Sequence, residues 1–195
     1  MQNNQQMKSF VVKLLKENLS EHYYYHDLDH TLYVTSKVLE IASHENCSDK
    51  ELELVHTAAL WHDTGYINTY KNHEQQSCLL AKQYLPEYGY SAEDIDKVCG
   101  IIMATKIPQL ANTKLERIMA DADLEYLGTS LFEEKSDMLF REVQLVNPSL
   151  TQEKWDEVQI SFLQNHFYFT KYCKENKEPI KQMHLSKLLN QRKPK

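Results

Sequence analysis

The sequence predicts an all-α fold, a single compact helical bundle of about eight helices. Apolar residues recur at helical spacing, as in Phe10, Val11, Leu14 and Leu15, and no segment alternates apolar and polar side chains over the length of a strand. Only 4 Gly and 5 Pro occur among 195 residues, fewer than a turn-rich β fold would need. No linker-like segment divides the chain, so we expect one domain over residues 1–195.

Capping signals place the expected helices in order. The first helix is expected over residues 8–19, and the second begins near Asp27. Ser48, with Glu51 three residues later, has the pattern of a capping box and opens a third helix that Gly65 stops. The remaining helices are expected after Asn72, Ser91, Thr113 and Ser130, then as one long helix over residues 152–173 and a short one over 180–190.

Composition limits the kinds of partner. The formal net charge of -6 argues against nucleic acid or an anionic membrane as the main partner. The four cysteines are scattered without a CxxC pair, which favours reduced thiols over a disulfide framework or a zinc knuckle. No signal-like core or membrane-spanning run occurs. We therefore expect a cytoplasmic protein that acts on a small molecule. The amphipathic C-terminal helices are equally compatible with a homo-oligomer.

Two histidine-containing segments stand out. In YYYHDLDH, His26 and His30 are four residues apart, which places both imidazoles on one face of a helix. In LWHDTG, His62 and Asp63 are adjacent at the end of an apolar helix. Adjacent helical residues diverge by about 100°, but Gly65 allows the backbone to bend there. Both segments can therefore direct polar groups toward one site.

Two further segments carry carboxylates. His73 and Glu74 open one helix, and Asp121 and Asp123 lie in an otherwise apolar helix. A carboxylate beside a core face is costly unless it is paired or binds a metal. Each segment also has an ordinary interpretation, because Glu74 suits the first turn of any helix and Asp121 is expected to face solvent rather than to bind a metal.

The segments carry more information together than singly. His30, His62, Asp63 and Asp123 make a mixed nitrogen and oxygen set from three predicted helices. Such a set suits a divalent ion with coordination positions left for water, rather than a closed structural zinc site.

The order of these segments resembles the HD superfamily of metal-dependent phosphohydrolases. The segments are YHDLDH, LWHDTGY, HEQQSC, MATK, DADLEYLG and FREV, and the similarity is greatest to small bacterial members known as predicted metal-dependent HD phosphohydrolases. The resemblance covers about residues 25–142, and we expect the C-terminal helices over 151–190 to pack on this core.

The resemblance implies an all-α fold and a divalent metal ion, which could be Mn, Fe, Co, Ni, Zn or Mg. The implied ligands are His30, His62, Asp63 and Asp123. Asp123 is preferred to Asp121 because the ligand follows Ala and precedes Leu or Arg in many relatives.

The resemblance also suggests catalytic and substrate-binding roles. His26 stands where cyclic-nucleotide phosphodiesterases of the superfamily place a general acid, and Glu74 is expected to position water. Lys106 is expected to act in catalysis and in binding the phosphate, and Arg141 and His73 to contact the substrate.

The chain departs from the family pattern in two places. Asp27 and His73 stand where Asn is usual. His73 is the only histidine between Asp63 and Asp123, so one metal site is expected, with a weaker second site possible at His73 and Glu74.

The implied activity is hydrolysis of a small phosphoester, such as a nucleotide, by metal-activated water. Three alternatives stay open from the sequence. The chain could be a nucleotide-binding regulatory module without turnover, or a di-iron oxygenase, which the single His73 disfavours. It could also be a helical bundle whose polar residues satisfy one another and bind no metal.

Overall fold

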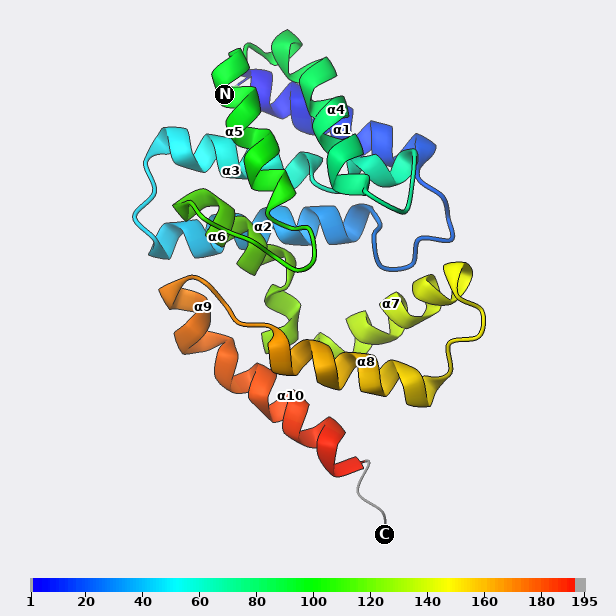
Figure 1. The fold of residues 1–195 in the computed structure, drawn as a ribbon. Helices are drawn as coiled ribbons and strands as arrows, with labels where there is room; N and C mark the ends of the chain where they lie inside the picture. The colour runs from blue at the N-terminus through cyan, green and yellow to red at the C-terminus, as the bar shows by residue number, and fades with distance from the viewer. Residues whose placement is uncertain (1, 192–195) are drawn as a thin grey trace.

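The computed structural model describes residues 2–191 and confirms the all-α prediction, with helices and no strand in that range (Figure 1). Ten α-helices and three short 3-10 helices occur there, more than the eight or so expected. They are α1 (Gln2–Asn18), α2 (Leu28–His44), α3 (Asp49–Trp61), η1 (Thr64–Ile67), α4 (His73–Tyr84), η2 (Leu85–Tyr88), α5 (Ala92–Met103), α6 (Lys114–Asp123), η3 (Glu125–Gly128), α7 (Phe132–Val146), α8 (Gln152–Asn165), α9 (Lys171–Asn176) and α10 (Glu178–Gln191).

Most of the expected caps are confirmed. The Asp27 side chain accepts a hydrogen bond from the backbone N–H of His30 at 2.7 Å and begins α2. Ser48 and Thr113 form complete capping boxes at the starts of α3 and α6, and Ser91 caps α5. These caps orient the ends of α2, α3 and α6, which carry the candidate ligands.

Two expected caps were wrong. Asn72 precedes α4, but its backbone is left-handed, with φ of 57°, and its side chain makes no capping bond. Its Oδ1 instead accepts a hydrogen bond from Lys106 Nζ at 3.2 Å. Helix α7 begins after Leu131, not Ser130, and without a side-chain cap.

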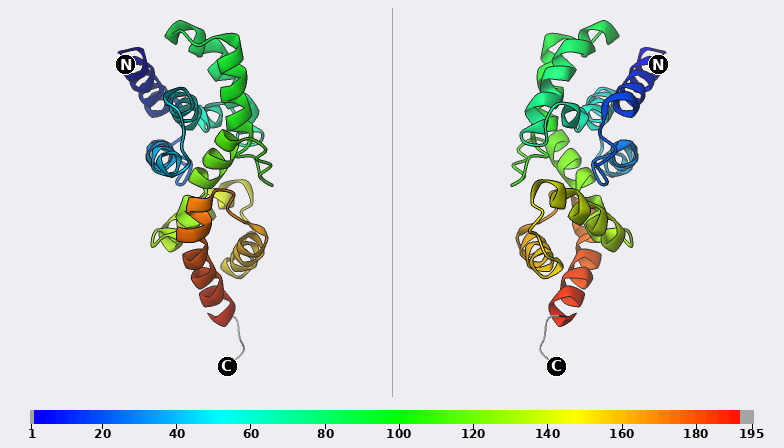
Figure 2. Two further views of the ribbon diagram at one scale, coloured as in Figure 1. Left: turned by 90° about the vertical axis from the view of Figure 1, so that its left-hand side faces the viewer. Right: turned by 90° about the vertical axis from the view of Figure 1, so that its right-hand side faces the viewer.

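Two apolar clusters organise the described residues. The larger is built mainly from α1 to α6, with α3 packed against α2, α5 and α6. The smaller is built from η3, α7, α8 and α10. Figure 1 and the side views in Figure 2 show these two groups of helices at opposite ends of the molecule. Tyr33 of α2 packs against both clusters.

The expected long helix over residues 152–173 is interrupted. It is divided into α8 and α9 by an extended segment that includes Phe169 and Thr170. The cause is Asp121, whose carboxylate accepts hydrogen bonds from the backbone N–H groups of both residues at 2.8 Å and from the Thr170 hydroxyl at 2.6 Å. Asp121 is therefore buried, contrary to the expectation that it faces solvent. Thr170 in turn caps α9 through Cys173 N–H.

None of the helices in residues 2–191 combines the length and the apolar character needed to cross a membrane. The four cysteines are free, as expected, and three of them are buried.

Gly65 is required by close packing rather than by the end of the preceding helix, because α3 ends at Trp61 and the φ of Gly65 is not positive. A Cβ atom at this position would lie 2.0 Å from the carbonyl oxygen of His73 and 2.7 Å from the backbone nitrogen of Ser77. The Ser77 hydroxyl bridges the same two segments, because it accepts from Gly65 N–H at 2.8 Å and donates to the His62 carbonyl at 2.5 Å. Helix α4 thus rests directly on the turn that follows His62.

We predict that Gly65→Ala lowers the free energy of unfolding by at least about 2 kcal/mol, because the added methyl group forces α4 away from this turn. Chemical denaturation measures this change. The matched control is Gly100→Ala, where the new methyl group would meet only Glu116 Oε1 at 3.8 Å inside α5. That variant should gain roughly 0.5–1 kcal/mol. Equal stabilities of the two variants would contradict the packing argument.

Candidate metal centre

Three helix ends bring the candidate ligands together. His30 lies in the first turn of α2, and Asp123 is the last residue of α6. His62 keeps helical geometry after α3, with φ of -58° and ψ of -37°, whereas Asp63 has φ of -106° and ψ of 5°. The chain therefore leaves the helix at Asp63, two residues before Gly65. This bend lets two adjacent side chains face one point.

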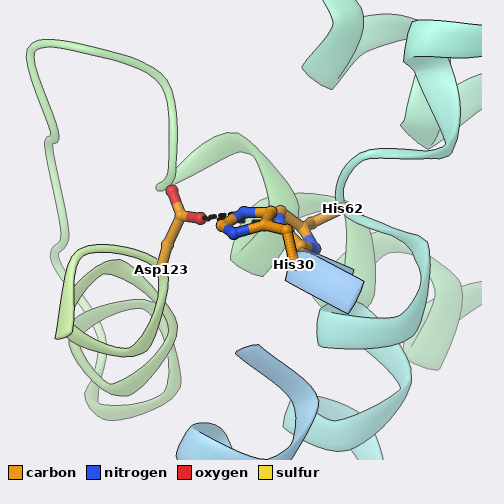
Figure 3. Close-up of side chains that lie close together, drawn as sticks. All are labelled: His30, His62 and Asp123. Carbon is orange, nitrogen blue, oxygen red and sulfur yellow. Dashed lines mark ion pairs between the residues drawn. The ribbon is translucent and has the colours of Figure 1, made fainter. Parts of the chain in front are cut away.

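The four side chains converge closely. His30 Nε2 lies 3.3 Å from Asp63 Oδ2 and 3.2 Å from Asp123 Oδ1. His62 Nε2 lies 3.1 Å from Asp63 Oδ2 and 3.5 Å from Asp123 Oδ1. Figure 3 shows both imidazoles directed at the Asp123 carboxylate. The ligand atoms of His30, His62 and Asp123 all lie within 4.8 Å of one another, a spacing that could hold a metal ion.

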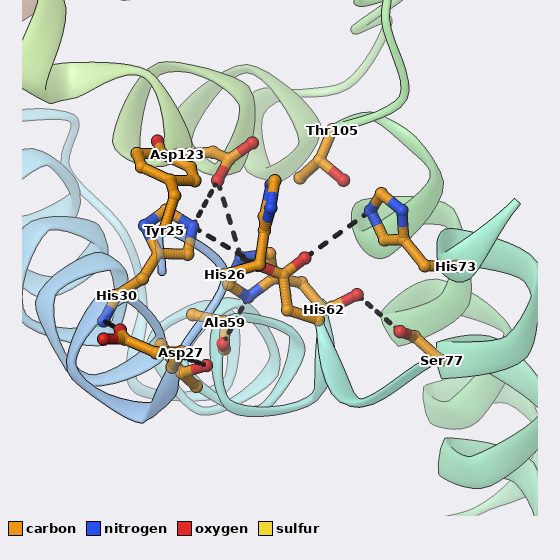
Figure 4. A network of polar contacts seen from close by, with 12 residues as sticks. Tyr25, His26, Asp27, His30, Ala59, His62, His73, Ser77, Thr105 and Asp123 are labelled. Atoms are coloured by element: carbon orange, nitrogen blue, oxygen red, sulfur yellow. Dashed lines mark hydrogen bonds and ion pairs between the residues drawn. The ribbon is translucent and has the colours of Figure 1, made fainter. Parts of the chain in front are cut away.

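The donor atoms fit a divalent cation. His30 Nε2, His62 Nε2 and Asp63 Oδ2 are buried and have no hydrogen-bond partner among the described residues. Buried polar atoms of this kind normally have partners, and lacking one costs about 1–3 kcal/mol each. His62 Nδ1 donates to the Ala59 carbonyl at 2.8 Å, so Nε2 presents its lone pair to the centre (Figure 4). Two imidazoles and two carboxylates suit a first-row divalent ion.

Electrostatics favours the ionised carboxylates. Burial opposes ionisation of Asp63, but His62 and His30 outweigh it and hold the pKa of this carboxyl well below its usual range. Close contacts with the imidazoles of His30 and His62 likewise outweigh the burial of Asp123 and lower its pKa to about 2. The same contacts raise the pKa of both imidazoles despite their burial. The centre therefore holds two ionised carboxylates, and a bound divalent cation would take the place of the imidazole protons that pair with them.

His26 lies beside the centre and is held by Glu142. Burial alone would raise the pKa of Glu142, but hydrogen bonds from the side chain and backbone of His26 and from Tyr25 N–H lower it. His26 Nδ1 lies 2.5 Å from Glu142 Oε1, and Oε2 accepts from Tyr25 and His26 N–H at 2.9 and 3.0 Å. The His26 ring also stacks on Tyr66, with centroids 4.3 Å apart. Glu142 and Tyr66 thus fix the orientation of the His26 ring, and Nδ1 is engaged by Glu142 rather than by the candidate metal ligands.

The role of Glu142 was missed from the sequence, although FREV was part of the pattern. A usable signal was present, because Phe132, Ser136, Leu139 and Glu142 recur at helical spacing on α7. A carboxylate in line with a buried face needs a partner. The sequence could not supply that partner, because His26 lies 116 residues away.

His73 and Glu74 lie on the other side of Asp63. His73 Nε2 is 3.6 Å from Asp63 Oδ1 and 3.7 Å from Glu74 Oε1. The His73 ring stacks on Tyr66 at 3.9 Å, and its burial lowers the pKa of the imidazole despite the nearby carboxylates. The structure thus brings both residues to the centre, and their roles as second metal site, water-positioning group or substrate contact stay predictions.

The two basic residues differ in position. Lys106 lines a cavity of about 440 Å³ next to the centre, where Asp63, Asp123 and His26 also contribute to the wall. Arg141 lies outside this lining. It is exposed, and its guanidinium sits 4.2 Å from the centroid of the Tyr24 ring.

The fold and the site together define an all-α protein with a histidine–aspartate centre. The family model for the HD domain matches residues 27–125, just over half of the chain, so the protein belongs to the HD domain family. A crystal structure of a predicted HD superfamily hydrolase from an uncultured Thermotogales bacterium superposes with a TM-score of 0.61. It is 19% identical, and the match covers 93% of this chain and 89% of that one, which shows a common fold. No curated protein matches the chain significantly.

We predict that Asp123→Ala loses bound metal, because it removes a carboxylate from the centre. Metal analysis after dialysis against Mn²⁺ or Zn²⁺ measures the stoichiometry. The matched variant is Asp121→Ala, two residues away on the same helix. It should keep the metal but lose roughly 2–4 kcal/mol of stability, because three donors lose their acceptor. Metal retained in Asp123→Ala, or lost only in Asp121→Ala, would contradict the assignment.

Proposed function

We propose that this protein is a metal-dependent phosphohydrolase that cleaves a small phosphoester, with nucleotides among the candidate substrates. The main support is the convergence of His30, His62, Asp63 and Asp123 beside a cavity. Membership of the HD domain family supports the same class of activity. The structural neighbour, described as a predicted HD superfamily hydrolase, is consistent with it.

A divalent ion held by these four residues would supply Lewis-acid polarisation of a phosphoryl oxygen and a more acidic water. Two ionised carboxylates among the ligands would favour a doubly charged cation. Lys106, on the cavity wall, would offset the negative charge of the phosphate.

His26 is assigned to the leaving group. Glu142 accepts the Nδ1 proton, which orients the ring and leaves Nε2 as the nitrogen that can carry a second proton. Water attacks phosphorus as the ester P–O bond breaks, and His26 Nε2 protonates the departing alkoxide. Glu74, which is buried on the cavity wall, would orient the water and receive its proton.

The decisive experiment is phosphate release from a panel of nucleotides and simple phosphoesters with several added divalent metals. We expect turnover by the wild type and none by Asp63→Ala, which lacks the carboxylate that lies between the two candidate histidine ligands. Equal activity of the two proteins would show that this centre is not the active site. Absence of release despite bound metal would refute the proposal and favour a binding module or iron–oxygen chemistry.

We predict that His26→Asn lowers turnover by roughly 10²–10⁴-fold, because the general acid is removed. Glu142→Gln should lower turnover by about 10–100-fold, since it weakens the group that orients His26. Both variants should bind metal with unchanged stoichiometry. Glu134→Gln, an exposed position on the same helix, is the matched control and should keep wild-type rates. Metal loss in His26→Asn would reassign this histidine as a ligand.

A further inference from the structure

The cavity beside the candidate metal centre continues well beyond it. One end carries the polar residues of the centre, including Asp63 and Asp123. The other end is formed by α7 and α8, which lie side by side in Figure 1. This second end, which we call the apolar chamber, is lined by Leu127, Phe132, Leu139, Val143, Trp155 and Val158, among others. Residues 127–158 lie outside the stretch matched by the HD domain model.

The sequence of each helix builds one wall of the chamber. On α7, Phe132, Leu139 and Val143 recur at helical spacing and line the cavity. On α8, Trp155 and Val158 are three residues apart and do the same. The two helices therefore turn apolar faces toward a shared space as well as toward the core.

Three of the polar side chains that line the chamber, Trp155, Ser136 and Gln159, bond to one another. Trp155 Nε1 donates to Ser136 Oγ at 3.1 Å, and the Ser136 hydroxyl donates to Gln159 Oε1 at 2.5 Å. These bonds engage the indole N–H and the hydroxyl hydrogen, which could otherwise recognise a polar ligand. A nucleobase buried here would lack those donors, whereas a hydrocarbon needs none.

The chamber and the candidate metal centre belong to one cavity, and this continuity indicates which kind of ligand the chamber would hold. Leu124 follows Asp123 directly, and both residues line the same cavity. A molecule with its phosphate at the centre can therefore extend its ester group past Leu124 into the apolar chamber. The cavity volume of about 440 Å³ falls in the range of small-molecule sites.

We propose that the apolar chamber binds the hydrocarbon group of the substrate, so that the protein acts on phosphate esters of alkyl chains rather than of nucleosides. This inference rests on the proposed phosphohydrolase function for the position of the phosphate. It assigns substrate selection to α7 and α8, and the metal-binding chemistry to α2, α3 and α6.

The test measures binding without turnover. Calorimetric titration of the full-length protein with n-alkylphosphonates of two to eight carbons, in the presence of Mg²⁺, uses ligands whose C–P bond is not hydrolysed. Affinity should rise roughly two- to fourfold per methylene group until the chamber is filled. Equal affinity for the ethyl and octyl compounds would overturn the inference.

A pair of variants localises the effect. Val158→Glu places a carboxylate in the chamber and should weaken octylphosphonate binding by at least about tenfold, with the ethyl compound unaffected. Val146→Glu is the matched control, since Val146 on α7 is 57% exposed and lies outside the cavity lining. Val158→Gln keeps the comparison available if the charged variant does not fold. Equal effects of the Val158 and Val146 substitutions would also overturn the inference.

Phosphate release separates this inference from the proposed function. Ethyl and octyl phosphate are assayed with the wild type under the same conditions. A chain-length gain in phosphonate binding without release of phosphate would support the chamber and refute the phosphohydrolase activity. Release from both esters at equal kcat/KM, with no chain-length gain in binding, would support the activity and overturn the chamber.

Discussion

The close approach of two imidazoles and two carboxylates is the constraint on which the rest of this structure depends. His30, His62, Asp63 and Asp123 come from three separate helix ends and are held with their donor atoms about one hydrogen-bond length apart. Ionised groups at this spacing inside a protein stabilise it only when their charges are balanced. The surrounding caps, the bend at Asp63 and the contact of α4 with the turn all fix these helix ends relative to one another.

Local rules predicted much of the fold. Capping boxes at Ser48 and Thr113 gave the helix starts correctly, because both partners of each box lie within four residues of sequence. The break between α8 and α9 was missed because its cause is a carboxylate, Asp121, that lies 48 residues before Phe169. The long helix expected over residues 152–173 is interrupted by these tertiary hydrogen bonds to Asp121.

The residues of the candidate site also fall into those that the sequence could select and those that it could not. Spacing and family resemblance together selected the four residues that converge, although each segment alone had an ordinary explanation. Glu142 was not selected, because its function depends on a partner brought near by the fold. Arg141 is exposed and lies over the Tyr24 ring, a contact that sequence spacing does not encode. The sequence predicted the local helical structure, but it did not predict which residues distant in the sequence contact one another in the fold.

Asp121 and Asp123 both lie in the last turn of α6 but contact different parts of the structure. One carboxylate faces the candidate metal centre, while the other holds the segment that joins α8 to α9. The end of α6 thus contacts two parts of the structure, the candidate metal centre and the segment between α8 and α9. Asn165, at the end of α8, lies 42 positions after Asp123 in the sequence. The hydrogen bonds to Asp121 nevertheless hold the segment that follows α8 beside the last turn of α6. Two side chains within one turn of α6 thus hold the candidate metal centre and the segment after α8 next to each other, and residues of α8 line the same cavity as the centre.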